Sequence, residues 1–330
     1  MRPVIGITMG DAAGIGPEIV IRSLISKEIR TAYRSVIIGD AVHLRSLASK
    51  LGADIHFAPF SGSAAADQVE IYDLGNLPSV FERGRDTEIT GRASAEYLTA
   101  AVDLWRDGKI DAIATAPISK KAIGMGGYNY PGHTEFLAEL TDTEEFAMSF
   151  FADKLRVVLL STHLPLTAAI DLVRTERLEK LIRFTDREMR RLLNKDVTIA
   201  VAGLNPHASE GGMFGAEEAS EIEPAIARCR AEGIDVSGPY SPDTVFLRGL
   251  KGEFDVCIAL YHDQGTIAVK SLSFGAGVNV TLGLPLIRTS VDHGTAYDIA
   301  EKYIADASSM AAAIVLAGEL ASQSRNAQTF

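Results

Sequence analysis

Short apolar runs alternate with longer amphipathic segments along this chain, and this alternation constrains the fold more than any other feature. Runs such as Val4–Met9, Ile110–Ala114 and Val256–Tyr261 have the length and composition of buried strands. Segments such as Gly91–Trp105 and Arg177–Leu193 carry apolar residues at helical spacing. Strands that alternate with helices predict an α/β protein with a largely parallel sheet.

One segment departs from the alternation. Two strand-like runs, Phe146–Phe151 and Arg156–Ser161, flank the short stretch Ala152-Asp153-Lys154 and predict a β-hairpin. A sheet that carries such a hairpin often has an edge available for pairing, so we expect this sheet to offer one to another subunit.

Composition excludes several classes of protein. The 330 residues are 47% hydrophobic, which is ample for a packed core. The net charge of -11 comes without a basic face, so we expect no nucleic-acid partner. Cys229 and Cys257 form no CxxC pair, which is typical of a reducing compartment. The apolar start of the chain is broken at Asp11, too early for a signal peptide or membrane span. We therefore expect a soluble cytoplasmic protein with no membrane partner.

Three histidines follow apolar strands. The runs VVLLSTH, TIAVAGLNPH and DVCIALYH end at His163, His207 and His262. Ligands bind at the carboxyl edge of parallel α/β sheets, and three imidazoles converging there would form a metal site with open positions, as catalytic metals have. Asp243 and Asp263 could fix a histidine tautomer by hydrogen bonding. The alternative is that each histidine simply satisfies a strand end or cap.

A second group of residues suits an anion. His133 and Thr134 stand at a predicted helix start, where free backbone N–H groups favour phosphate. Alternatively, Thr134 is only a helix cap. Lys270 and Arg288 could pair with a phosphate or carboxylate, with Asn279 nearby in the sequence. Each cation taken singly is more often a solvated surface charge.

The stretch Thr8–Glu18 follows the first strand and opens a helix, which suits a loop that cradles phosphate. Its spacing is neither the GxGxxG fingerprint nor a P-loop, since Ile19 and Pro17 stand where those motifs need Gly and Lys. A plain strand-to-helix turn is the alternative.

Several motifs together resemble one known family. They are GDAAGIGPE, ATAPISK, PGHTE, STHLPL, GLNPHASEGG, PDTVF, YHDQG and GVNVTLGLPLIRTSVDHGTA, in order from residue 10 to residue 296. The chain thereby resembles the 4-hydroxythreonine-4-phosphate dehydrogenase family of the vitamin B6 pathway. That family in turn resembles the isocitrate and isopropylmalate dehydrogenase fold, which implies two α/β subdomains with a cleft between them.

The resemblance extends to a dinucleotide site. The motif GDGIGPE of those dehydrogenases is similar to Gly10–Glu18 with two fewer residues, and HGSAPDIAG is similar to His293–Ala300. This implies that NAD or NADP binds near Gly10, Asp11, Gly14, Gly16, His293, Gly294 and Asp298.

The resemblance also implies the remaining site residues. It assigns a divalent metal to His163, His207 and His262, shared across a homodimer. It assigns the phosphorylated substrate to His133, Thr134, Lys270, Asn279 and Arg288. The implied reaction is oxidation of a secondary alcohol by NAD, followed by decarboxylation of the β-keto acid. All-histidine ligation favours zinc, cobalt or nickel, while magnesium or manganese stay open. The sequence identifies no general base.

Some positions depart from the biosynthetic pattern. Met9-Gly10-Asp11 stands where the biosynthetic enzymes typically have Pro-Gly-Glu, and Asn129-Tyr130-Pro131 and Ala152–Arg156 also differ. These features are similar to a catabolic branch that acts on 4-phospho-D-threonate or 4-phospho-D-erythronate. The choice between pyridoxal phosphate synthesis and sugar-acid catabolism stays open.

We expect residues 1–127 plus 278–330 to form the cofactor side, and residues 128–277 to form the metal, substrate and dimerisation side. Two other classes of function compete. A phosphate acyltransferase has a related fold but would leave the three histidines unexplained. A three-histidine zinc hydrolase would leave the HGTAYDIA loop without a role.

Overall fold

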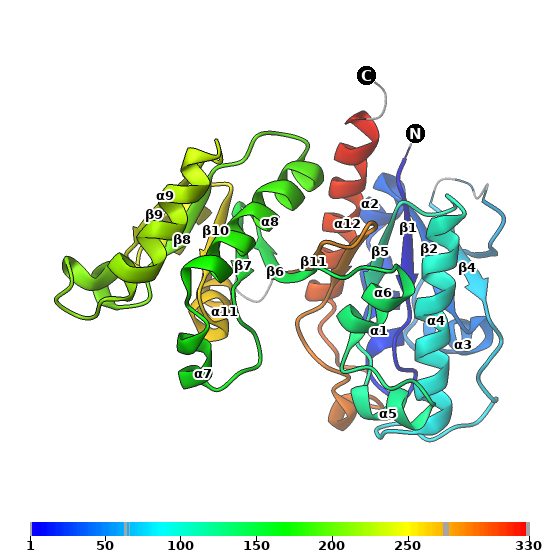
Figure 1. The fold of residues 1–330 in the computed structure, drawn as a ribbon. Helices are drawn as coiled ribbons and strands as arrows, with labels where there is room; N and C mark the ends of the chain where they lie inside the picture. Colours follow the sequence, from blue (N-terminus) through cyan, green and yellow to red (C-terminus); the bar gives the residue numbers. More distant parts are fainter. Residues whose placement is uncertain (1, 63–64, 66, 273–276, 328–330) are drawn as a thin grey trace. The chain divides into compact units, whose positions relative to one another are not determined.

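The computed structural model describes residues 2–62, 65, 67–272 and 277–327, with side chains placed up to residue 325. The chain divides into two compact units (Figure 1). The terminal unit comprises Met1–Glu145 and Leu284–Phe330, and the central unit comprises Phe146–Gly283. Within the described residues, every helix is too short or too polar to cross a membrane.

The sheet of the terminal unit is parallel throughout, as the alternation of strands and helices predicts. All its loops that follow strands therefore leave the same carboxyl edge. The strands in spatial order are β3 (Phe57–Pro59), β4 (Val69–Asp73), β2 (Arg34–Gly39), β1 (Val4–Thr8), β5 (Ala112–Thr115) and β12 (Ile287–Ser290).

Helices cover both faces of this sheet, and Figure 1 shows α4 and α12 on opposite sides. Pro17 stands in the first turn of α1, where its missing N–H costs no helical bond. Asp40, Thr87 and Ser119 each cap a helix by accepting a hydrogen bond from a backbone N–H. The helices are α1 (Gly16–Leu24), α2 (Lys27–Ala32), α3 (Ala41–Lys50), α4 (Glu88–Arg106), α5 (Lys120–Met125), α6 (His133–Leu140), η3 (Tyr297–Ile299) and α12 (Ser308–Ala327).

The sheet of the central unit mixes parallel and antiparallel pairs. β6 is antiparallel to both of its neighbours, β11 and β7, whereas β7, β10, β8 and β9 run parallel. The predicted hairpin is confirmed as β6 and β7. The strands in spatial order are β11 (Val278–Leu282), β6 (Ala147–Ala152), β7 (Leu155–Leu159), β10 (Val256–Ala259), β8 (Ile199–Ala202) and β9 (Val236–Tyr240).

Both strands of the hairpin are internal to the sheet. β6 lies between β11 and β7, and β7 lies between β6 and β10, so both hairpin strands are paired on both sides. β11 follows much later in the chain and adds to the hairpin, and within the described residues the sheet ends instead at β9, which pairs with β8.

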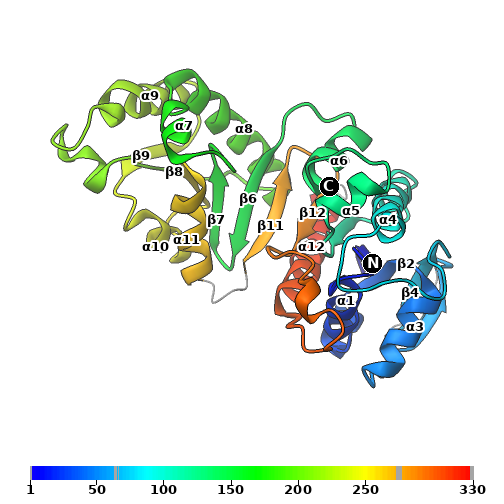
Figure 2. The same cartoon turned by 90° about the horizontal axis from the view of Figure 1, so that it is seen from below.

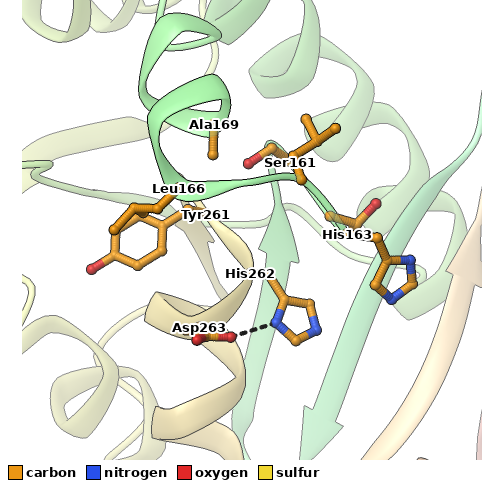
Figure 3. A pocket seen from close by; sticks show the side chains of 9 residues that line it. Ser161, His163, Leu166, Ala169, Tyr261, His262 and Asp263 are labelled. Carbon is orange, nitrogen blue, oxygen red and sulfur yellow. Dashed lines mark hydrogen bonds and ion pairs between the residues drawn. The ribbon is translucent and has the colours of Figure 1, made fainter.

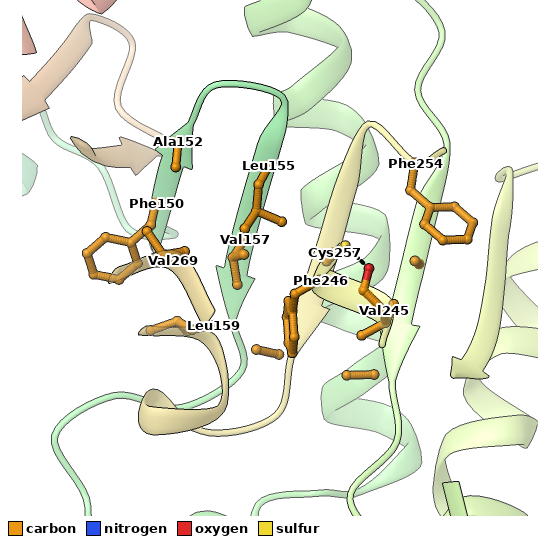
Figure 4. Packing of buried hydrophobic residues seen from close by; sticks show 13 residues of the cluster. Phe150, Ala152, Leu155, Val157, Leu159, Val245, Phe246, Phe254, Cys257 and Val269 are labelled. Atoms are coloured by element: carbon orange, nitrogen blue, oxygen red, sulfur yellow. Dashed lines mark hydrogen bonds between the residues drawn. The ribbon is translucent and has the colours of Figure 1, made fainter. Parts of the chain in front are cut away.

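Helices lie on both faces of the central sheet, with α8 and α9 on one side and α10 and α11 on the other in Figure 2. Its core gathers apolar side chains from β6, β7, β10 and α10 (Figure 4). Cys257 belongs to this core, where it packs as a small apolar residue. The helices are α7 (Leu166–Asp171), α8 (Thr175–Leu193), η1 (Pro206–Glu210), η2 (Glu218–Ile222), α9 (Glu223–Ala231), α10 (Val245–Leu250) and α11 (His262–Leu272).

Both boundaries between the units lie later in the chain than the expected boundaries, which follow residues 127 and 277. Residues 128–145 belong to the terminal unit, because α6 packs against α4. Residues 278–283 belong to the central unit, because β11 pairs with β6.

Candidate functional site

The loops that carry His163, His207 and His262 all follow the carboxyl ends of strands at one edge of the central sheet. β7, β10 and β8 are parallel neighbours that end at Leu159, Ala259 and Ala202. His163, His262 and His207 follow these ends within a few residues. The structure thus places the three loops side by side, as the pattern of the sequence predicts.

Two of the histidines lie close together. The ring centroids of His163 and His262 are 5.6 Å apart, and both side chains line a cavity of about 210 Å³ (Figure 3). Asp263 places a carboxylate oxygen 2.7 Å from Nδ1 of His262. This contact leaves Nε2 of His262 as the nitrogen available to a ligand.

His207 does not line this cavity. The rings of His207 and Phe214 have their centroids 6.5 Å apart. Asp243 is exposed and accepts a hydrogen bond from Ser241, 2.6 Å away. Across the described ranges of this single chain, no group of three or more His, Cys, Asp and Glu side chains is placed to hold a metal ion.

The helix start predicted at His133 is confirmed. α6 begins at His133 and Gly132 is its N-cap, with no side chain capping the first turn. Thr134 lies inside that turn, so the alternative that Thr134 caps the helix is wrong. The first N–H groups of α6 therefore remain without a side-chain acceptor, which favours an anion at this position.

Arg288 is a buried cation of the same unit. It lies on β12, is 2% exposed and donates hydrogen bonds of 2.9 and 3.2 Å to Oγ1 of Thr115. Burial lowers the pKa of Arg288 to about 10, although the carboxylate of Glu135 acts in the opposite direction. A buried guanidinium with a lowered pKa is a cation whose charge is stabilised when an anion binds.

The imidazole of His133 is half-buried and lies near this cation. Burial lowers the pKa of His133 well below its ordinary value, and the charge of Arg288 adds to the effect. Nε2 of His133 is buried and has no hydrogen-bond partner among the described residues. Buried polar atoms normally have partners, so this nitrogen indicates a missing ligand.

The other two residues assigned to substrate lie in the central unit. Asn279 is on β11, and its Oδ1 is likewise buried without a partner in the described part of the chain. Lys270 is exposed on α11.

The two loops assigned to the dinucleotide contact one another. The N–H of Ile15 donates to the carbonyl of Thr295 at 2.9 Å. A Cβ at Gly14 would lie 2.6 Å from that same carbonyl oxygen, so the close approach requires glycine. Residues far apart in the sequence therefore form one surface, which includes the exposed Asp298 and the loop of His293 and Gly294.

Asp11 shapes this loop from inside. It is fully buried, and its carboxylate accepts hydrogen bonds from the N–H of Ala13 at 2.8 Å and from the hydroxyl of Tyr297 at 2.7 Å. Burial raises the pKa of Asp11 against the opposing effect of these bonds. Its neighbour Gly10 has a φ of +68°, which L side chains rarely adopt. The resemblance implies that Asp11 lies near the cofactor. A direct contact requires an exposed carboxylate, and in this chain the carboxylate of Asp11 is buried.

Two residues of this region escaped the sequence patterns. The hydroxyl of Tyr297 also lies 3.1 Å from Asp86, and Arg83 donates to the carbonyl of Ala300 at 2.7 Å. Tyr297 occupies the position of proline in the related motif HGSAPDIAG, and that difference could have identified it. Arg83 stands in no motif.

Comparison with known proteins places these features in a family. A family model described as "Pyridoxal phosphate biosynthetic protein PdxA" matches residues 31–317. The D-threonate 4-phosphate dehydrogenase of Cupriavidus necator is 44% identical over 326 residues, which cover 97% of this chain and 98% of that protein. The 4-hydroxythreonine-4-phosphate dehydrogenase of Desulforapulum autotrophicum is 44% identical over 324 residues, with 96% and 95% covered.

Solved structures agree with this result. The crystal structure of 4-hydroxythreonine-4-phosphate dehydrogenase from Klebsiella pneumoniae has a TM-score of 0.90 and 41% identity to this chain. The match covers 97% of this chain and 98% of that one.

Proposed function

The chain belongs to the family of the pyridoxal phosphate biosynthetic protein PdxA, and we propose that it oxidises D-threonate 4-phosphate with NAD and a divalent metal. It is an oxidoreductase, a dehydrogenase that acts on a 4-phosphorylated hydroxy acid. The proposal concerns the identity of that acid, the cofactor, the metal and the residues that bind them.

The observation that carries the proposal is the pairing of Arg288 and His133. A buried guanidinium, an uncapped helix start and a buried ring nitrogen that has no partner within the described residues belong to the same unit. Together they offer a charge and several N–H donors to one anion. We assign the substrate phosphate to His133, Thr134 and Arg288. Lys270 and Asn279 are proposed as further substrate residues.

The choice of acid rests on the sequence around the loops. Met9-Gly10-Asp11 and Asn129-Tyr130-Pro131 are similar to the catabolic branch of the family. Its substrates carry a hydroxyl where 4-hydroxythreonine 4-phosphate carries an amine. The enzymes of Cupriavidus necator and Desulforapulum autotrophicum, one named for each acid, are both 44% identical to this chain, so 4-hydroxythreonine 4-phosphate is the second candidate and 4-phospho-D-erythronate the third.

The histidine donors suit zinc, cobalt or nickel. Nε2 of His262 is left available by the contact between Nδ1 and Asp263, and His163 lies beside it in the same cavity. These residues fit two positions of a metal site, and we propose that His207 completes the set when two copies of the chain form a homodimer. A bound metal would act as a Lewis acid that lowers the pKa of the substrate alcohol.

NAD, or NADP, is proposed to bind the surface formed by the loop of Gly14 and the loop of His293. When bound, the nicotinamide supplies the hydride acceptor, and loss of CO2 from the resulting β-keto acid is proposed to follow. The protein's own part is to hold the phosphate at Arg288 and so position the remote reacting end. Cys229 and Cys257 are free thiols, which fits the cytoplasm that we propose as its location.

The test is NADH formation at 340 nm by purified protein supplied with zinc. D-threonate 4-phosphate, 4-hydroxythreonine 4-phosphate and 4-phospho-D-erythronate are compared, each with and without a chelator. We expect turnover that is fastest with D-threonate 4-phosphate and that the chelator abolishes.

A different result would contradict each part of the proposal. Faster turnover with the amine substrate would move the chain to the biosynthetic role. Turnover that a chelator leaves unchanged would remove the metal. Folded, metal-supplied protein that forms no NADH with any of the three acids would refute the proposed substrates.

A further inference from the structure

Gln264 links two of the histidine loops through one buried side chain. It lies in the first turn of α11 and is 9% exposed. Its Oε1 accepts a hydrogen bond of 2.7 Å from the N–H of Leu260, two residues before His262. Its Nε2 donates a bond of 2.8 Å to the carbonyl of Gly203, four residues before His207. One amide thus spans the carboxyl ends of β10 and β8.

The third histidine loop is tied to the same point. The hydroxyl of Ser161 donates to the carbonyl of Leu260 at 3.1 Å, and the N–H of Leu160 donates to the carbonyl of Ala259 at 2.9 Å. Leu260 therefore bonds to Gln264 through its N–H and to Ser161 through its carbonyl. All three loops that carry His163, His207 and His262 are connected by side-chain bonds at their bases.

The loop of His207 needs such support, because its backbone is strained. Six consecutive residues, 207–212, have positive φ, and four of them are not glycine. A non-glycine residue in the left-handed region costs about 1 kcal/mol or more, so the run persists only where its surroundings hold it.

Glu218 supplies part of this support. Its buried carboxylate accepts bonds from the N–H groups of Leu204 at 2.8 Å and Asn205 at 2.7 Å. These bonds attach the loop to η2, whereas the bond from Gln264 to Gly203 attaches it to the strand end that carries His262. Of these two side chains, Gln264 is the one that connects the loop of His207 to the loop of His262.

We propose that Gln264 is a positioning residue for the metal, which fixes the loops of His207 and His262 to one another so that each chain presents its histidines in one arrangement. This inference rests on the proposed metal-dependent function. The role needs an amide, because one end must accept a hydrogen bond and the other must donate one. A carboxylate of the same size keeps the acceptor and loses the donor.

The experiment compares Gln264→Glu and Gln264→Met with the wild-type chain. Affinity for Zn²⁺ is measured by competition with a chromophoric chelator, and Co²⁺ binding by its visible absorbance. Unfolding in urea is measured on the same samples. We expect both variants to bind Zn²⁺ about 10- to 100-fold more weakly, the usual effect of removing a group that orients metal ligands.

Thr198→Val is the matched control. Thr198 and Asp255 connect the same two strands, β8 and β10, at their amino ends, with bonds of 3.0 Å from each N–H to the other side chain. The control therefore loses a comparable tie on the edge opposite the histidines. We expect it to lose stability and to bind Zn²⁺ with an affinity within about twofold of wild type.

Folded Gln264→Glu or Gln264→Met that binds Zn²⁺ like the wild type would overturn the proposal. So would equal losses of affinity in these variants and in Thr198→Val, because the effect would then be a general loss of stability. Gln264→Glu keeps the size of the side chain, so it provides the measurement where Gln264→Met does not fold. Wild-type protein that binds neither Zn²⁺ nor Co²⁺ would overturn the metal-dependent function and this role together.

Discussion

Replacing Arg288 by methionine should remove turnover without making the protein less stable. Arg288 is 2% exposed, and burial lowers its pKa from 12.5 to about 10. Because the folded pKa lies below the unfolded one, the folded state disfavours the charged form, and this cost is fully present at every pH below about 10.

The magnitude follows from the difference in pKa. A difference of about 2.5 corresponds to about 3 kcal/mol at neutral pH. The bonds to Thr115 that the variant loses share one hydroxyl oxygen, and as bonds from a charged group they offset roughly 1.5–3 kcal/mol of this. Arg288→Met should therefore unfold with a free energy equal to that of the wild type or up to about 1.5 kcal/mol above it. The loss of charge-assisted bonds to the substrate phosphate, each about 1.5–3 kcal/mol, should lower kcat/KM by roughly 100-fold or more.

Urea unfolding with and without inorganic phosphate measures both effects. Phosphate at about 100 times its Kd should stabilise the wild type by about 2.7 kcal/mol and leave Arg288→Met unchanged. Arg30→Met is the matched control, since Arg30 is 8% exposed but bonds to Asp67 at 2.8 Å and to the carbonyl of Ile25 at 2.9 Å. That variant should lose stability and keep its response to phosphate.

The reasoning on Arg288 fails in either of two cases. A less stable Arg288→Met would mean that the guanidinium is satisfied within the protein, as Arg30 is. A variant that phosphate still stabilises like the wild type would place the anion elsewhere.

Three further outcomes are expected. The pH profile of kcat/KM should fall as pH rises through about 10, where Arg288 loses its charge, and a profile level to pH 11 would contradict this. Burial lowers the pKa of His43 to about 4, so the free energy of unfolding should fall by up to about 3 kcal/mol as pH drops from 6.5 to 4. His43→Phe should flatten that dependence in urea titrations, and an unchanged slope would exclude His43 as its source. Tyr297→Phe leaves Asp11 with one bond fewer. It should raise the KM for NAD several-fold while the KM for the phosphorylated acid stays constant, and equal changes in both would contradict the role of that loop.

The sequence predicts which strands and helices carry the proposed metal and phosphate sites, because these elements follow from the periodicity of apolar residues. The apolar runs locate β7, β8 and β10, and the parallel arrangement brings their carboxyl ends to one edge. The helix start at His133 follows from the same kind of local pattern. These features need only the chemistry of neighbouring residues, which a single sequence contains.

The remaining features depend on partners far along the chain. The buried carboxylate of Asp11 accepts a hydrogen bond from Tyr297, and β6 is paired on its second side by β11. The hydrogen bond from Gln264 to Gly203 joins residues 61 positions apart. Such contacts leave no periodic trace, so the sequence predicts neither the bond between Tyr297 and Asp11 nor the one between Gln264 and Gly203.

Several unfavourable local conformations of the chain lie at the proposed sites, and this predicts a link between ligands and stability. His163 and His207 have φ of +24° and +53°, Arg288 is a buried cation, and Nε2 of His133 lacks a partner among the described residues. Each of these features costs stability in the free protein, and we expect a bound ligand to offset part of that cost. In the free protein, hydrogen bonds such as those of the Gln264 side chain hold the histidine loops in place. An anion and a metal should therefore each raise the free energy of unfolding, and their effects should be lost separately in Arg288→Met and Gln264→Met.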